Sequence, residues 1–137
     1  MVVTGANAGI GYFTAEQLAA TGATVVLGCR DRAKGELVVQ AIRARALDAR
    51  LRCLRTNLAD PPSLPATVAA LDVDSLDAVV LDAGAYLSGP ERRISAQGHE
   101  LIFATNHLEH FALVAYPPRV LPAARGRRLT GCVGGRA

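Results

Sequence analysis

The sequence lacks several features that would assign it to a specialised class. Only 20% of its 137 residues are charged, and its three cysteines are odd in number and far apart. Cysteines without paired spacing argue against a disulfide framework or a metal site and indicate buried, reduced thiols. No apolar run reaches the roughly 18 residues of a membrane span, and no leader precedes the first expected strand. We therefore expect a cytoplasmic protein with no membrane partner and no metal.

The chain also has only a slight excess of positive charge. The formal net charge is +3, and the basic residues are densest at residues 43–45, 50–55 and 125–128. Such runs are typical of solvated helix faces and tails. Because no recognition motif accompanies them, we expect no nucleic-acid partner.

Hydrophobic residues, in contrast, make up half of the chain, enough for the packed core of one domain. Short β-branched runs alternate with longer Ala- and Leu-rich stretches, a pattern that indicates βαβ units and a parallel sheet. The expected strands are residues 1–3, 24–29, 50–54 and 77–81, and the expected helices are residues 10–21, 32–45, 61–71 and 95–115. The apolar stripes place Phe13, Leu18 and Ala19 on the inner face of the first helix, and Leu37, Val38, Ala41 and Ile42 on that of the second.

A glycine-rich turn, Thr-Gly-Ala-Asn-Ala-Gly-Ile-Gly over residues 4–11, joins the first strand to the first helix. A pyrophosphate must approach such a backbone closely: Gly5 permits the tight turn, Gly9 the close approach, and Gly11 the packing of helix against strand. The helix N-terminus adds unpaired N–H groups and a partial positive charge. We expect a dinucleotide to bind along this turn, at Gly5, Ala6, Asn7, Ala8, Gly9, Ile10 and Gly11.

Three further motifs follow in order: Asn57-Leu58 after the third strand, Asp82-Ala83-Gly84 after the fourth, and Asn106-His-Leu-Glu-His-Phe111 in the fourth helix. Together with the turn they resemble the short-chain dehydrogenase/reductase family, in its retinol-dehydrogenase-like and protochlorophyllide-reductase-like branch. The resemblance covers about residues 1–116, the nucleotide-binding half of such a domain. It implies an α/β fold of the Rossmann type, here a partial domain, with a parallel sheet in the order 3-2-1-4 and helices on both faces.

The resemblance extends the expected cofactor site to Asn57, Leu58, Asp82, Ala83 and Gly84. Two of these depart from the family's usual pattern, which has Asp at the position of Asn57 and Asn at that of Asp82. The Asn57 side-chain oxygen can still accept a bond from the adenine amino group. A carboxylate cannot donate as an amide does, so Asp82 is expected to leave a neighbour unpaired.

The end of the second strand decides the expected choice of cofactor. In proteins that prefer NAD, an acidic residue about 20 residues past the glycine-rich turn holds the ribose hydroxyls. Here the strand ends Gly28-Cys-Arg30, and Arg30 resembles the basic residue of members that prefer NADP. A guanidinium there would meet the 2′-phosphate, so we expect NADP(H) to be preferred over NAD(H).

The resemblance implies four catalytic groups: a Tyr and a Lys in a Tyr-x-x-x-Lys motif, a Ser, and an Asn in the fourth helix. Asn106 stands where that Asn belongs and is the only one of the four that can be placed. No Tyr-x-x-x-Lys exists in the chain, and Lys34 is its only lysine. His107 and His110 could suggest a metal pair, but they belong to the family's own motif and are expected to pack.

Beyond Tyr116 the periodicity dissolves, and residues 117–137 predict an irregular, degenerate tail with a fifth strand frayed or absent. The fourth strand would then present an unpaired apolar edge, and the fourth helix more apolar surface than the sheet can bury. Exposed edges and apolar patches drive association. We therefore expect a marginally stable chain that forms a homo-oligomer through its fourth helix.

Three functions remain open at this point. By resemblance the chain is an oxidoreductase that transfers hydride between NADP(H) and a small alcohol or carbonyl substrate, with the substrate bound only by a complete enzyme. It could instead be a nucleotide-binding module that performs no chemistry, or a truncated gene product with no function. Without a positioned acid/base, proton transfer loses about 10²–10⁴-fold or more, so we expect this chain to be inactive as it stands.

Overall fold

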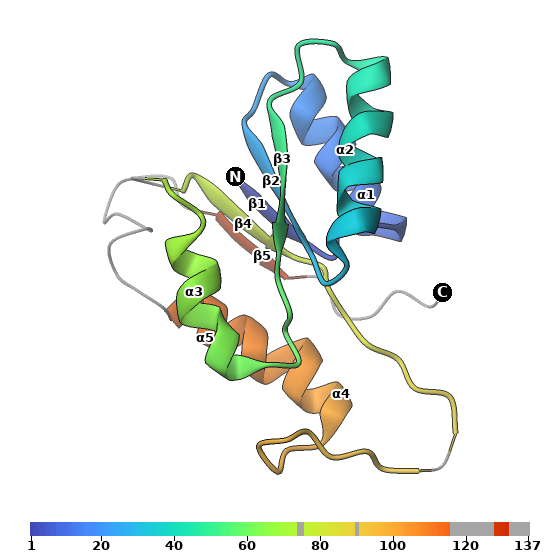
Figure 1. Ribbon diagram of the computed structural model, residues 1–137, viewed down its shortest axis with the longest axis vertical. Helices are drawn as coiled ribbons and strands as arrows, with labels where there is room; N and C mark the ends of the chain where they lie inside the picture. Colours follow the sequence, from blue (N-terminus) through green and yellow to red (C-terminus); the bar gives the residue numbers. More distant parts are fainter. Residues whose placement is uncertain (74–75, 90, 116–127, 132–137) are drawn as a thin grey trace.

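The computed structural model describes residues 1–73, 76–89, 91–115 and 128–131. Its centre is a parallel sheet of five strands in the order β3-β2-β1-β4-β5 (Figure 1). The strands are β1 Val2–Thr4, β2 Val25–Cys29, β3 Leu51–Arg55, β4 Ala78–Leu81 and β5 Arg128–Gly131. The expected order 3-2-1-4 is confirmed and gains one strand at the β4 side.

Helices cover both faces of this sheet. One face carries α1 (Gly9–Ala20) and α2 (Arg32–Arg45). The other carries η1 (Pro61–Ser63), α3 (Leu64–Ala69) and a helical stretch formed by α4 (Leu101–Phe103), the π-helical turn η2 (Ala104–Leu108) and α5 (Glu109–Ala115). Because strand side chains alternate, Val3 packs on the α1/α2 side and Val2 on the α3/α5 side. Both are buried, as in parallel sheets generally.

The last helical stretch is shorter than the expected helix over residues 95–115. Residues before Leu101 form a turn that includes an antiparallel bridge between Ile94 and Glu100, and Gly98 has a φ of 83°. The Glu100 carboxylate then accepts bonds from the N–H groups of Ile102 and Phe103 at 2.9 and 2.6 Å. This capping starts the helix at Leu101, because a carboxylate satisfies N–H groups that have no partner within the helix.

Three side chains expected to face the core are instead exposed. Phe13 on α1 is 60% exposed and Leu37 on α2 is 64% exposed, and Ala41 is exposed as well. The buried positions of α1 are Gly11, Ala15 and Ala19, and those of α2 are Gly35, Val38, Val39 and Ile42. Small residues along these stripes bring the helices close to the sheet, and the larger apolar side chains beside them then point outward.

The C-terminal segment contains the fifth strand that the sequence predicted to be frayed or absent. Four of the residues assigned to an irregular tail form β5 and pair in parallel with β4 from Ala78 to Leu81. The expected unpaired edge of β4 is therefore wrong, since its N–H and C=O groups have partners on both sides. Residues 117–127 and 132–137 lie outside the described residues. Across the described ranges, no helix is both long and apolar enough to cross a membrane.

Gly35 allows α2 to lie close to the sheet, and this contact generates a first prediction. A Cβ at Gly35 would overlap the Cys53 sulfur and lie 3.1 Å from the Cys29 sulfur. In Gly35→Ala, overpacking alone should lower the free energy of unfolding by roughly 1–3 kcal/mol. The higher helix propensity of Ala should offset about 1 kcal/mol of this loss. Urea unfolding measures this difference. The double variant with Cys53→Ala should recover much of the loss, whereas a Gly35→Ala protein that is more stable than the parent by the full gain in helix propensity, about 1 kcal/mol, would contradict the close contact.

Candidate functional site

The glycine-rich turn after β1 is shaped by two residues with positive φ, Gly5 at 70° and Gly9 at 57°. A Cβ on Gly5 would lie 2.7 Å from the Cα of Ala83, so the turn packs tightly on the end of β4. A Cβ on Gly11 would lie 2.6 Å from the carbonyl oxygen of Gly5. A Cβ on Gly9 would have no atom within 4 Å beyond its own chain neighbours. The turn is therefore closed toward the protein and open toward solvent.

The N-terminus of α1 faces this open side. Its N-cap residue, Ala8, offers no side-chain acceptor, and the first turn of the helix contains no acidic residue. Residues 7–10 are exposed, while Ala6 is fully buried. The first N–H groups of a helix have no partner within it, and the dipole adds positive charge there. An accessible, glycine-lined turn with uncapped N–H groups fits the pyrophosphate of a dinucleotide.

A hydrogen-bonded network lies directly beneath the turn. The Thr4 hydroxyl oxygen accepts bonds from the backbone N–H groups of Asp82 at 3.0 Å and Ala83 at 3.1 Å. The same oxygen lies 3.0 Å from Nε2 of His110, and Nδ1 of His110 lies 3.2 Å from the carbonyl oxygen of Asn106. The ends of β1 and β4 are thereby tied to α5 and η2.

This network determines the state of His110. A carbonyl oxygen only accepts, so Nδ1 carries a proton. In the neutral imidazole Nε2 then accepts from the Thr4 hydroxyl, whose oxygen also lies 3.4 Å from the carbonyl oxygen of Val80. Burial lowers the pKa of His110, against smaller raising effects of the Asn106 carbonyl and the Asp82 charge. His107, in contrast, is exposed and stacks on Phe103 with ring centroids 5.3 Å apart. The two histidines thus have separate environments and do not form a metal pair.

Asn106 is the expected catalytic residue, and its amide is engaged with the backbone of Ala85. Its Oδ1 accepts from the Ala85 N–H at 2.6 Å, and its Nδ2 donates to the Ala85 carbonyl at 3.0 Å. The side chain therefore clamps the segment that leaves β4, close to Gly84. Within this geometry Asn106 positions the candidate site, and its role in a proton path stays a prediction.

The other expected cofactor residues lie at the same edge of the sheet. Oδ1 of Asn57 accepts from the Ala59 N–H at 3.2 Å, and Leu58 is buried. The Asp82 carboxylate packs against Gly11, where a Cβ would lie 2.7 Å from Oδ2. Arg30 follows β2 and is exposed. The turns after β1, β2 and β3 therefore lie at the same carboxyl edge of the sheet as the end of β4, the edge at which ligand sites occur in such sheets.

The sequence predicts that Asp82 leaves a neighbouring group without a hydrogen-bond partner. In the part of the chain that the structure describes, no buried polar side-chain atom lacks a partner because of Asp82. Among those residues, the atom that lacks one is Oε2 of Glu109, whose residue is 4% exposed. Burial raises the pKa of Glu109, which His99 lowers and Asp60 raises by smaller amounts. Sequence reasoning missed Glu109 because it treated residues 106–111 as one packing motif. The available signal was a carboxylate directly before a histidine expected to be buried.

Glu109 and His110 generate a prediction of pH dependence. In the folded chain burial raises the pKa of Glu109 above its ordinary value of 4.5. The folded state therefore loses stability as the pH rises above that value. The folded chain resists protonation of His110 below the ordinary 6.5, so stability is lost as the pH falls from there. Glu109→Gln should be more stable than the parent by about 1–3 kcal/mol at pH 8, with a smaller difference at pH 4.5.

Denaturant unfolding of both proteins between pH 4.5 and 8 checks this expectation. The variant should keep the loss of stability below pH 6.5, because His110 is unchanged in it. A stability difference that stays constant across the whole pH range would show that Glu109 is not held neutral by burial.

Comparison with known proteins places this geometry in a family. The family model described as "short chain dehydrogenase" matches residues 1–127. Human retinol dehydrogenase 11 is 36% identical over 115 residues, covering 82% of this chain and 36% of that protein. The WW domain-containing oxidoreductase of Gallus gallus is 33% identical over 114 residues, covering 83% of this chain and 28% of that protein. The chain thus spans about a third of the length of these curated relatives.

Solved structures agree with this result. An uncharacterised protein from Mycobacterium paratuberculosis is 36% identical with a TM-score of 0.70, covering 87% of this chain and 41% of that one. A short-chain dehydrogenase from Sphingobium yanoikuyae in complex with NADPH is 27% identical with a TM-score of 0.70, covering 83% of this chain and 44% of that one. Sequence motifs, sheet order and comparisons together show that this chain belongs to the short-chain dehydrogenase/reductase family.

Proposed function

We propose that this chain binds NADP(H) in preference to NAD(H) and belongs to an oxidoreductase that acts on a small alcohol or carbonyl compound. The observation that carries the preference is the arrangement at the end of β2. The nearest acidic residue, Asp31, uses its Oδ1 to cap α2, accepting from the N–H groups of Ala33 at 2.9 Å and Lys34 at 3.2 Å. Arg30 beside it is exposed and faces no anion in the described part of the chain.

The remaining assignments follow the order of the turns. The pyrophosphate would lie on residues 5–11, Asn57 and Leu58 would border the adenine, and residues 82–84 would border the ribose at the nicotinamide end. Bound there, the cofactor supplies or accepts a hydride. The names of the retinol dehydrogenases support an apolar alcohol as the substrate class of the whole protein.

A second candidate function is a nucleotide-binding module without chemistry. The specific observation that favours it is the absence of Tyr-x-x-x-Lys from the 137 residues. Asn106, the single catalytic position that matches, is committed to Ala85. Binding and turnover therefore need separate tests, and binding without turnover supports the module.

The cofactor preference predicts a difference in affinity. Titration calorimetry should give a dissociation constant for NADP⁺ that is roughly ten- to a hundredfold lower than that for NAD⁺, the effect of a charge-assisted bidentate contact. Arg30→Ala should remove most of this ratio by weakening NADP⁺ binding alone. Equal constants in the parent protein, or a ratio that Arg30→Ala leaves unchanged, would overturn the assignment.

The chain alone should show no turnover. With NADPH or NADP⁺ and simple alcohols, aldehydes or ketones, the absorbance at the reduced nicotinamide band should change no faster than in protein-free controls, because the 137 residues contain no Tyr-x-x-x-Lys to supply the acid/base. Steady turnover that disappears in Gly9→Ala, whose positive φ suits glycine, would contradict this. If neither nucleotide binds at all, both candidate functions fail.

A further inference from the structure

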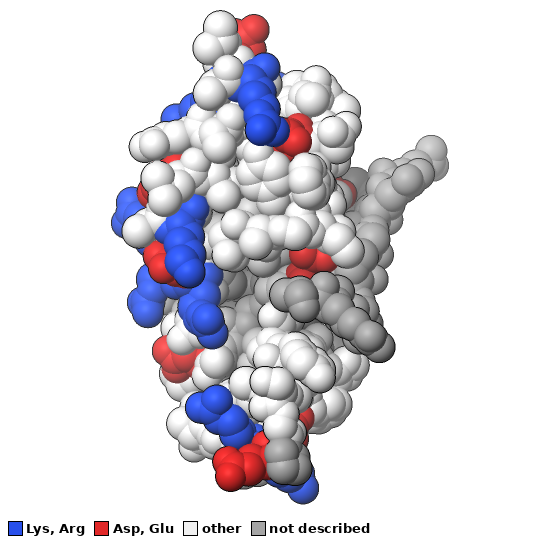
Figure 2. All heavy atoms as spheres, turned by 90° about the vertical axis from the view of Figure 1, so that its right-hand side faces the viewer, with Lys and Arg blue, Asp and Glu red and all other residues white. Residues whose placement is uncertain are grey.

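Most arginines along α2 and β3 have a structural partner. They gather along one side of the molecule in Figure 2, which corresponds to the β3 edge of the sheet. Each of these guanidinium groups donates to a carbonyl or carboxylate: Arg43 to Leu51 O at 2.6 Å, Arg45 to Glu16 Oε1 at 2.8 Å, Arg50 to Gly22 O at 2.5 Å and Arg52 to Ala70 O at 3.2 Å. Arg32 lies 3.6 Å from Glu36. These guanidinium groups bind backbone carbonyl oxygens or surface carboxylates, so each of them already has a partner within the protein.

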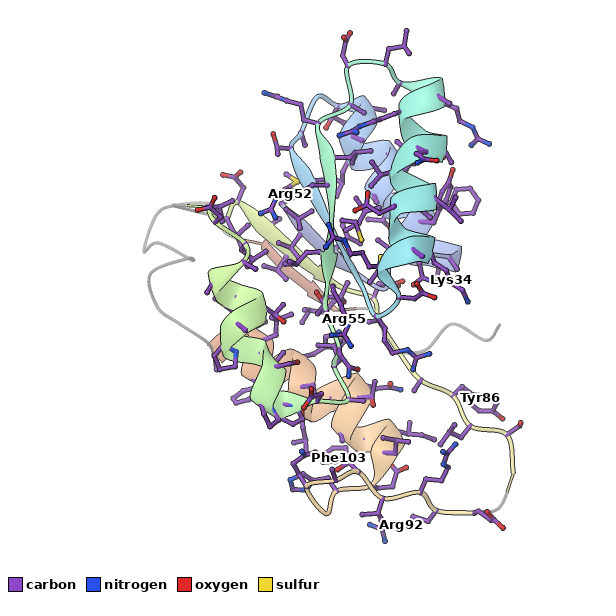
Figure 3. The ribbon with its side chains drawn as sticks, viewed as in Figure 1. Lys34, Arg52, Arg55, Tyr86, Arg92 and Phe103 are labelled. Carbon is purple, nitrogen blue, oxygen red and sulfur yellow. The ribbon has the colours of Figure 1, made fainter. Side chains whose placement is uncertain are left out.

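Arg55 differs from them. It is the last residue of β3, it is exposed, and it has no hydrogen bond or ion pair within the residues that the structure describes. Its strand partner is Cys29, the last residue of β2, which directly precedes Arg30. Figure 3 shows Arg55 at the end of β3 that adjoins the turn from β2 into α2. Two arginines without anionic partners therefore stand at the carboxyl ends of neighbouring strands.

The alternation of side chains places Arg55 on the α2 side of the sheet. Cys53, two residues earlier on the same side, lies 3.9 Å from the carbonyl oxygen of Arg32 in the first turn of α2. Two residues advance a strand by about 6.6 Å. Arg55 thus lies past the first turn of α2, beside the connection formed by Arg30 and Asp31. A long guanidinium side chain at that point can reach a group held by Arg30.

The anions near this connection are already engaged. Asp31 caps α2 and Glu36 pairs with Arg32. A phosphomonoester carries a charge of about −1.5 to −2 at neutral pH, so one arginine does not neutralise it. Guanidinium groups bind such oxygens through two parallel N–H donors.

We propose that Arg55 is a second specificity-determining residue, which contacts the 2′-phosphate of NADP(H) together with Arg30. This inference rests on the proposed preference for NADP(H) and adds a residue that the expected cofactor site does not contain. The alternative is that Arg55 only keeps the edge strand β3 soluble, a common use of charge at sheet edges. The two roles differ in whether Arg55 distinguishes ligands with and without a 2′-phosphate.

The test measures binding of two matched pairs of ligands by calorimetry: NADP⁺ with NAD⁺, and adenosine 2′,5′-bisphosphate with 5′-AMP. Arg55→Gln should weaken binding of both 2′-phosphate ligands by about three- to fivefold, the upper part of the range for an exposed charged contact. It should leave NAD⁺ and 5′-AMP within about twofold of the parent. Arg55→Lys should restore part of the loss, because it keeps the charge without the bidentate geometry.

Arg92→Gln serves as the matched control, because Arg92 is also exposed but belongs to the long loop between β4 and α4, far from the end of β3 (Figure 3). It should leave all four affinities unchanged. Circular dichroism melts of each variant show that the fold is retained, and an Arg55→Gln protein that does not fold is replaced in the comparison by Arg55→Lys.

Two negative results separate this inference from the proposed function. If the parent protein shows no preference for NADP⁺, the proposed function itself fails. If the parent prefers NADP⁺ and Arg30→Ala abolishes the preference while Arg55→Gln does not alter it, the proposed function stands and the role of Arg55 is overturned. Equal weakening of all four ligands by Arg55→Gln also overturns it, since the effect would then be unspecific.

Discussion

The hydroxyl group of Thr4 holds the ends of β1 and β4 and the helix α5 together at one point. It accepts from the N–H groups of Asp82 and Ala83 and donates to His110. Its two lone pairs take the two N–H groups, and its proton has Nε2 of His110 at 3.0 Å as the nearer acceptor and the carbonyl oxygen of Val80 at 3.4 Å as the farther one. The glycine-rich turn begins at the next residue, and its packing on Ala83 requires that β4 end where Thr4 holds it. The geometry of the candidate cofactor site therefore depends on this network.

The helix that completes the network also contains a group that is costly to bury. Glu109 and His110 are adjacent and both buried, and burial moves their pKa values in opposite directions, up for Glu109 and down for His110. In each case burial favours the neutral form. A neutral His110 is also what the Thr4 hydroxyl and the Asn106 carbonyl require. Asn106, one turn earlier, hydrogen-bonds the backbone of Ala85. The protonation states of Glu109 and His110 are therefore linked to the backbone that borders the site.

Charge at the opposite edge of the sheet divides into two groups. Arginines along α2 and β3 donate mainly to backbone carbonyl oxygens, which helps to protect an edge strand from pairing with another chain. Arg30, directly after β2, and Arg55, the last residue of β3, have no such side-chain partners in the described residues. The same residue type thus stabilises the fold at one end of β3 and remains available for a ligand at the other, where strand ends and helix N-termini converge.

Local signals in the sequence determined the βαβ order, the parallel sheet and the glycine-rich turn. These features depend on hydrophobic period, on turn residues and on positive φ at positions such as Gly5 and Gly9, which neighbouring residues decide. Tertiary structure alone decided that Phe13 and Leu37 are exposed, because that depends on how closely small residues bring each helix to the sheet. It likewise decided that Arg128–Gly131 pairs with β4, that Glu109 is buried without a partner for Oε2, and that Arg55 ends beside Arg30. Such outcomes depend on residues distant in the chain, so local patterns in the sequence do not fix them.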